Sequence, residues 1–278
     1  MAIKQAVNFE ELTMGDAFLF ATMMKNKSTC QKVIQTLLEN PEIEDIDYIE
    51  VEKQEKHSYE SKGVRFDVYV KGHNGVAYVV EMQTVDTKEL HKRARYYQSM
   101  ADIGQIKKGK KWKYKDLKDS YVIFICREDI FGLGQYKYLF ENTCTEIAGL
   151  KLNDGSYKIF FNTKGTTGNV SPDVLHFLKF IEGVKNDNTF ILELEKQMEQ
   201  IKKDEKWQVS YMQTLVREQD IFDRGEEQGI KKGIDKGVEK VAINMLLNKL
   251  SFSVISENTG LSIEELEEIS KDELSLDR

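Results

Sequence analysis

Alternation of apolar and polar residues predicts a β-hairpin in the segment GVRFDVYVKGHNGVAYVVEMQ (63–83). In its first half every second residue is apolar, at Val64, Phe66, Val68 and Val70. Successive side chains of a strand point to opposite faces, so Asp67 lies on the polar face of the first strand. By the same alternation, Glu81 and Gln83 share one face of the second strand. The turn between the strands decides whether these two faces coincide.

The turn sequence GHNG (72–75) allows two registers, which make opposite predictions for the two carboxylates. A three-residue loop with Gly75 in the left-handed conformation pairs residues whose numbers add to 148, and this places Asp67 opposite Glu81. A two-residue Asn74-Gly75 loop instead pairs Asp67 with Met82, because a one-residue slip sends every side chain to the other face. We favour the first register.

Two carboxylates directly opposite each other destabilise a strand pair unless a positive charge lies between them. A divalent cation would remove this repulsion, and hard oxygen ligands suit Mg²⁺ or Mn²⁺. A water acidified by such a cation is a natural nucleophile for a phosphodiester. The alternative is a solvated hairpin face on which Arg65 neutralises Asp67 and Glu81. Alternation alone leaves both interpretations open.

The segments around the hairpin predict strands with helices on either side. Helical periodicity covers 9–39, where Thr13 and Asp16 form a capping-box pattern. A second such pattern, Asp86 with Glu89, opens a helix through KELHKRARYYQSMADI. Further strands are predicted at IDYIEV (46–51), YVIFIC (121–126) and YKIFF (157–161), and a further helix from Pro172. This order indicates a mixed α/β domain.

From about Asn188 the pattern changes to charged helices, and we divide the chain into residues 1–187, 188–224 and 225–278. The last part spaces its glycines four residues apart, at Gly225, Gly229, Gly233 and Gly237. Each glycine destabilises a helix by roughly 1 kcal/mol relative to alanine, so four of them require a compensating interaction. Self-association through these C-terminal helices is one prediction, and a flexible charged linker is the alternative.

The final segment, SFSVISENTGLSIEELEEIS (251–270), predicts a helical hairpin in which Ser262 and Glu265 form a capping box. Its dimensions fit a helix-turn-helix, but its second helix carries IEELEE. Acidic residues on that helix oppose its insertion into a DNA groove, so a hairpin that contacts protein or packs on itself is favoured over DNA reading.

Composition narrows the class of protein without deciding its function. The chain of 278 residues is 40% hydrophobic and 31% charged, and its formal net charge is −7 at pH 7. The negative charge argues against coating of nucleic acid through bulk charge, while a local basic surface stays compatible. Cys30, Cys126 and Cys144 lack metal-ligand spacing, and no segment has the pattern of a signal peptide or membrane span. We expect a reduced, cytoplasmic protein without a membrane partner.

The ordered set DAFLF, RFDVYV, VVEMQ and RARYYQSM resembles the recombination-promoting nuclease and putative transposase family within the PD-(D/E)XK nuclease superfamily. The resemblance covers nearly the whole chain. It implies a restriction-endonuclease-like α/β core, a mixed central sheet flanked by helices, with an α-helical C-terminal appendage. It also implies a transposase-like, Mg²⁺-dependent DNA endonuclease, with Mn²⁺ as the alternative cation, that promotes recombination or acts on foreign DNA. A catalytically inactive binding or regulatory protein that keeps the fold is the alternative.

The same resemblance assigns the residues of a catalytic site. Asp67, Glu81 and the backbone carbonyl of Met82 are implied as metal ligands. Gln83 stands where many superfamily members carry a lysine. A glutamine amide donates and accepts hydrogen bonds but carries no charge, so electrostatic stabilisation must come from the metal or from arginine or lysine.

Other residues have two interpretations each. Arg93 or Arg95 lies near the scissile phosphate, or both form a charged outer face while Tyr96 and Tyr97 pack on the sheet. Asp16 supports the site from the first helix, or it caps that helix. A basic loop with aromatic residues contacts DNA, or it is only solvated. The loop residues predicted to bind DNA are Lys107, Lys108, Lys110, Lys111, Trp112 and Lys113.

Overall fold

The computed structural model describes residues 8–43, 46–55, 64–85, 87–105 and 113–276. The chain forms two compact units, Met1–Val209 and Ser210–Arg278. The boundary expected at 224/225 falls inside the continuous helix α6 (Glu205–Leu247). The division into residues 1–187, 188–224 and 225–278 stays a prediction.

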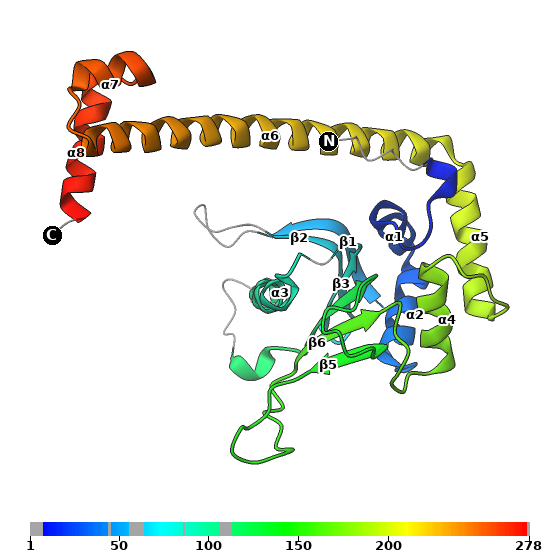
Figure 1. Ribbon diagram of the computed structural model, residues 1–278. Helices are drawn as coiled ribbons and strands as arrows, with labels where there is room; N and C mark the ends of the chain where they lie inside the picture. Colours follow the sequence, from blue (N-terminus) through cyan, green and yellow to red (C-terminus); the bar gives the residue numbers. More distant parts are fainter. Residues whose placement is uncertain (1–7, 44–45, 56–63, 86, 106–112, 277–278) are drawn as a thin grey trace. The chain divides into compact units, whose positions relative to one another are not determined.

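A six-stranded mixed sheet forms the centre of the first unit (Figure 1). In spatial order its strands are β1 (Ile46–Glu55), β2 (Val64–Gly72), β3 (Ala77–Gln83), β4 (Ser120–Cys126), β6 (Ser156–Asn162) and β5 (Lys137–Phe140). Strands β3, β4 and β6 run parallel, whereas β1–β2, β2–β3 and β5–β6 are antiparallel pairs. The C-terminal ends of β3, β4 and β6 therefore meet at one edge of the sheet.

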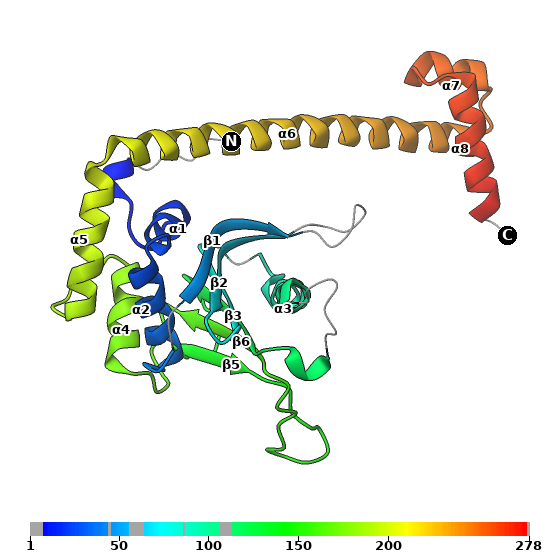
Figure 2. The ribbon, with the colours of Figure 1, turned by 180° about the vertical axis from the view of Figure 1, so that it is seen from behind.

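Helices cover both faces of this sheet (Figures 1 and 2). Helix α3 (Leu90–Gln105) packs on one face through a cluster that includes Val79, Val122 and Phe124. The helices on the other side are α1 (Ala17–Met24), α2 (Lys27–Leu38), α4 (Pro172–Ile181) and α5 (Thr189–Lys203). The predicted mixed α/β arrangement is confirmed, and β4 is buried as a central strand should be.

The N-terminal helical region is not the single helix that its periodicity suggested. A short 3-10 turn (Phe9–Glu11) precedes α1, and Asn26 caps a separate helix α2 by accepting a hydrogen bond from the Thr29 N–H. The predicted Thr13–Asp16 capping box is wrong, because Asp16 is itself the N-cap of α1. Its carboxylate accepts hydrogen bonds from two N–H groups of the first turn, and this satisfies donors that a helix start leaves open.

The strands expected from the sequence are confirmed, but β5 was missed. Its four residues, KYLF, form one of the two edge strands of the sheet and are half-buried or exposed. So short a run carries little periodic signal, and its position depends on pairing with β6.

In the second unit, α6 continues into a hairpin of α7 (Phe252–Thr259) and α8 (Ile263–Leu276). The Ser262–Glu265 capping box is confirmed by two reciprocal side chain-to-backbone hydrogen bonds. Ala242, Ile255 and Leu266 form a small core. The four spaced glycines lie on α6. A Cβ added at any of them would have no heavy atom within 4 Å apart from the nearby backbone of the same helix. No described helix is both long and apolar enough to cross a membrane.

The register predicted for the β2–β3 hairpin is confirmed. Backbone pairing runs from Lys71–Ala77 to Val68–Val80, so paired numbers add to 148. The Gly72 N–H donates to the Val76 carbonyl (2.9 Å), and Gly75 closes the turn with φ +87°. This excludes the two-residue loop and places Asp67 and Glu81 on the same face.

We expect Gly75→Ala to lower the free energy of unfolding by about 1–2 kcal/mol, because the left-handed backbone is unfavourable for a residue with a Cβ. Chemical denaturation at pH 8, followed by circular dichroism, measures the change. His73→Ala in the same turn is the control: its exposed side chain pairs with Asp47 at the surface, and loss of such a pair changes stability by about 0.5 kcal/mol or less. Equal losses in the two variants would contradict the role of Gly75.

Candidate active site

Strands β2 and β3 are linked by side chains where their backbone pairing ends. Next to the Val68–Val80 pair, the Asp67 N–H donates to Glu81 Oε1 (2.8 Å). In return, the Met82 N–H donates to Asp67 Oδ2 (3.1 Å). Each carboxylate therefore accepts a backbone hydrogen bond from the opposite strand, and the two acidic groups are brought together at this end of the hairpin.

The Glu81 side chain is fully buried, whereas Asp67 is half-buried. Burial raises the pKa of Glu81 well above its ordinary value, and the neighbouring negative charge of Asp67 raises it further. Arg93 and the Asp67 N–H act in the opposite direction by stabilising the carboxylate. A buried carboxylate next to a second one is electrostatically unfavourable without a positive charge.

Arg93, on the first turns of α3, supplies that charge. Its Nη2 donates to Glu81 Oε2 (2.6 Å) and its Nη1 donates to Gln83 Oε1 (3.0 Å). Its Nε donates to the Tyr97 hydroxyl (2.9 Å), and the guanidinium lies 4.9 Å from the centre of the Tyr97 ring. One arginine therefore contacts two of the predicted site residues of β3, Glu81 and Gln83.

Tyr97 holds this arginine in place. Its hydroxyl donates to the Arg65 carbonyl on β2 (3.2 Å), and its ring meets that of Phe66 edge-on with 5.0 Å between centroids. Burial raises the pKa of Tyr97 to about 12, so the hydroxyl stays protonated at neutral pH. The tyrosine links α3 to β2 next to Asp67.

The arginines and tyrosines of α3 had two interpretations, and the structure gives a different outcome for each residue. Arg93 points into the site, whereas Arg95 is exposed on the helix surface. Tyr97 packs on the sheet as expected, but Tyr96 is exposed. Arg93 borders the apolar stripe that contains Leu90 and Tyr97, whereas Arg95 lies on the opposite side of the helix, and sequence reasoning missed this signal.

The sheet edge beside Gln83 carries polar residues that sequence reasoning missed. The Arg127 N–H, directly after β4, donates to the Gln83 carbonyl (3.1 Å). The Arg127 guanidinium binds Glu182 at the end of α4 through two hydrogen bonds (3.0 and 3.1 Å), and Glu182 also accepts one from the Thr163 hydroxyl (2.7 Å). The position of Arg127 directly after a buried strand was a signal that it lies at this edge of the sheet. No local sequence pattern pointed to Glu182, because only the tertiary fold brings it to this edge.

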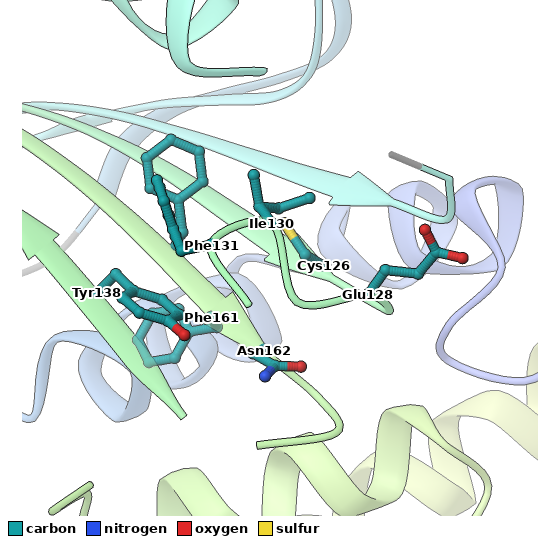
Figure 3. A pocket seen from close by; sticks show the side chains of 8 residues that line it. Cys126, Glu128, Ile130, Phe131, Tyr138, Phe161 and Asn162 are labelled. Carbon is teal, nitrogen blue, oxygen red and sulfur yellow. The ribbon is translucent and has the colours of Figure 1, made fainter. Parts of the chain in front are cut away.

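A shallow pocket lies at the same ends of β4 and β6 (Figure 3). It is lined by Cys126, Glu128, Ile130, Phe131, Tyr138, Phe160, Phe161 and Asn162. Its mostly apolar wall contains none of the predicted ligands, so it is separate from the carboxylate pair.

The donor set suits a hard divalent cation. Asp67 and Glu81 offer carboxylate oxygens and the adjoining Met82 offers a backbone carbonyl, and such ligands match Mg²⁺ or Mn²⁺. Within the described part of the chain, no group of three or more His, Cys, Asp or Glu residues could hold a metal. Two carboxylates agree with Mg²⁺ chemistry, in which waters and substrate complete the coordination.

The remaining predicted residues have different outcomes. The Asp16 carboxylate caps α1. The start of α1 nevertheless lies close to the end of α4, because a Cβ added to Gly15 would be 2.8 Å from the Ile181 carbonyl, next to Glu182. Lys113 is exposed next to a short 3-10 turn. The other predicted DNA-binding residues, Lys107, Lys108, Lys110, Lys111 and Trp112, lie outside the described residues. These roles stay predictions.

Comparison with known proteins gives one result. A family model described as PD-(D/E)XK nuclease family transposase matches residues 17–227, which include the whole sheet and the carboxylate pair. No curated protein and no solved structure matches the chain. The central sheet with its flanking helices is consistent with the restriction-endonuclease-like α/β fold.

The raised pKa of Glu81 predicts a pH-dependent stability in EDTA. A carboxyl with a raised folded-state pKa favours the fold while it is protonated, so its contribution is complete below the ordinary value of 4.5 and is lost as pH rises through the folded value. We expect the unfolding free energy of wild type to fall over that range relative to Glu81→Gln, measured by urea denaturation. Glu89→Gln, at an exposed position, is the control and should follow wild type. Parallel curves for wild type and Glu81→Gln would contradict the raised value.

Proposed function

Because the chain belongs to the PD-(D/E)XK nuclease family of transposases and is therefore a nuclease, we propose that it cleaves DNA phosphodiesters with the help of a divalent cation. The proposal depends on one observation above all, the reciprocal pairing of Asp67 with Glu81 (2.8 and 3.1 Å). A fold that places two carboxylates together, with one fully buried, needs positive charge at that point, and the single charge of Arg93 balances only part of theirs.

Asp67, Glu81 and the Met82 carbonyl would hold the cation, which we propose to be Mg²⁺ with Mn²⁺ as a substitute. When bound, the cation supplies Lewis-acid chemistry, which stabilises charge on the phosphate and makes water a better nucleophile. Gln83 carries no charge, and its amide oxygen and nitrogen can orient a water or the substrate by hydrogen bonds. The Gln83 Nε2 already donates to the Val85 carbonyl, which fixes the orientation of this amide.

Arg93 takes over the electrostatic role that a lysine at position 83 would have. Its guanidinium contacts both Glu81 and Gln83, and so it lies where the scissile phosphate would approach the carboxylates. An arginine stays charged at any pH at which the protein is folded and can bind two phosphate oxygens at once. A positive group aimed at the phosphate stabilises the charge that develops in the transition state.

The wider role also remains a proposal. We propose that the protein acts on DNA in the cytoplasm, either in recombination or in the cleavage of foreign DNA. The lysine-rich loop would supply a further contact to that DNA. Self-association through the C-terminal helices fits the four glycines of α6, whose Cβ positions are open in a single chain and leave room for a second helix. The acidic Ile263–Leu276 helix favours a protein rather than a DNA partner.

We expect the full chain to nick supercoiled plasmid DNA in Mg²⁺ and to lose this activity in EDTA. Asp67→Ala should lower the rate by about a hundredfold or more, because it removes a cation ligand. Asp187→Ala, an exposed aspartate near the end of the first unit, is the matched control and should nick like wild type. Gel electrophoresis of the plasmid forms measures the rates.

Equal nicking by wild type and Asp67→Ala would assign the activity to a contaminant or to another site. Absence of nicking in both, with cation binding intact, would favour the alternative of a binding or regulatory protein that keeps the fold.

Moving the positive charge from position 93 to position 83 tests where the site requires it. Gln83→Lys should lower activity, because the new ammonium would face Arg93, whose Nη1 lies 3.0 Å from the Gln83 Oε1. Arg93→Gln should lower it as well, by roughly ten- to a thousandfold if it removes a group that stabilises the transition state. The double variant Gln83→Lys/Arg93→Gln restores one positive charge and should exceed both single variants in plasmid nicking. Additive losses would contradict a shared role.

A further inference from the structure

The oxygens that would bind a cation are engaged by donors of the chain itself. Glu81 Oε1 accepts from the Asp67 N–H, and Glu81 Oε2 accepts from Arg93 Nη2 (2.6 Å). Asp67 Oδ2 accepts from the Met82 N–H. The backbone donors are fixed in the sheet, and they leave further lone pairs on each carboxylate. The Arg93 guanidinium is a mobile charge at the end of a long side chain.

Charge makes Arg93 and a divalent cation competitors. Without the cation, one guanidinium balances part of the charge of two carboxylates. With the cation bound at the same carboxylates, the guanidinium would face a double positive charge at close range beside the buried Glu81, where repulsion is strong. The Arg93 side chain is 32% exposed while that of Glu81 is 1% exposed, so the arginine has a route towards solvent and the glutamate has none.

The surroundings of Arg93 allow it to move without losing its anchor. Tyr97 is fixed by its hydrogen bond to the Arg65 carbonyl and by its contacts with Phe66 and Phe124. Arg93 Nε donates to the Tyr97 hydroxyl, and the guanidinium lies over the Tyr97 ring. Rotation around this contact can carry the two Nη groups away from the carboxylate.

We propose that Arg93 acts as an exchangeable internal cation: it occupies Glu81 until the divalent cation binds, and it then turns to the DNA phosphate. The inference deepens the proposed function and rests on it. Binding of the cation and binding of the phosphate are then coupled, because the cation releases the guanidinium that the phosphate requires. Before the cation binds, the arginine is held by Glu81 and contributes little to DNA affinity.

Arginine side-chain NMR of the full-length wild type tests the exchange directly. The Arg93 Nε and Nη signals are assigned from their loss in Arg93→Lys, and Mg²⁺ is titrated without DNA. We expect the Arg93 signals to shift with saturation while those of the exposed Arg95 stay in place. In Asp67→Ala the Arg93 signals should not respond, because the cation site is lost but the arginine remains on Glu81.

The outcomes separate the two proposals. If Mg²⁺ shifts the Met82 amide in an Asp67-dependent way and leaves Arg93 unchanged, the exchange is refuted while the cation site stands. If Mg²⁺ causes no saturable shift at any of these groups, the cation site of the proposed function fails, and the exchange fails with it.

A second experiment measures the affinity of the protein for the cation. We expect Arg93→Gln to bind Mn²⁺ at least about tenfold more tightly than wild type at pH 8.5, by electron paramagnetic resonance, because no guanidinium has to be displaced. Lys92→Gln removes a positive charge from the neighbouring, exposed position of α3 and should leave the affinity unchanged. Equal or weaker binding by Arg93→Gln would overturn the exchange.

Discussion

The burial of the Glu81 carboxylate is the constraint on which the architecture of the site depends. The side chain is inaccessible to solvent and lies beside a second acid, so its charge must be compensated inside the protein. The Asp67 N–H and the Arg93 guanidinium provide this compensation from two different elements, β2 and α3. Helix α3 must therefore lie against this sheet face, and Tyr97 holds it there by contacting β2. The contacts that pack α3 against the sheet therefore also shape the candidate site.

The hairpin part of the site was accessible from sequence because it is local. The GHNG turn has few stable geometries, and the left-handed Gly75 selects the one that brings Asp67 and Glu81 to the same face. Strand identity follows from alternation over a few residues, and the turn then fixes the register. Alternation cannot show whether the two acids bind a cation, because a solvated strand face would alternate in the same way. The family resemblance supplies this expectation.

The rest of the site required the fold. Arg93 and Arg95 are two residues apart in one helix and so lie on nearly opposite sides of it, and the packing of α3 on the sheet brings Arg93 to Glu81. Glu182 comes close to Arg127 through a contact between the ends of α4 and β4, far apart in sequence. The Thr13–Asp16 pattern failed for a local reason: both residues can cap a helix, and α1 begins at Ala17, so that Asp16 is its N-cap.

The neutral glutamine at position 83 affects how charge is delivered to the candidate site. A lysine on β3 would be attached to the same strand as Glu81 and would move with it. The positive charge of this chain comes instead from α3, through a side chain that reaches Glu81 and Gln83 from outside the sheet. Because that group is independent of the strand, it can neutralise the carboxylate in one state and a phosphate in another. A neutral Gln83 is suited to this arrangement, since its amide oxygen accepts from the guanidinium and adds no charge that would oppose its return.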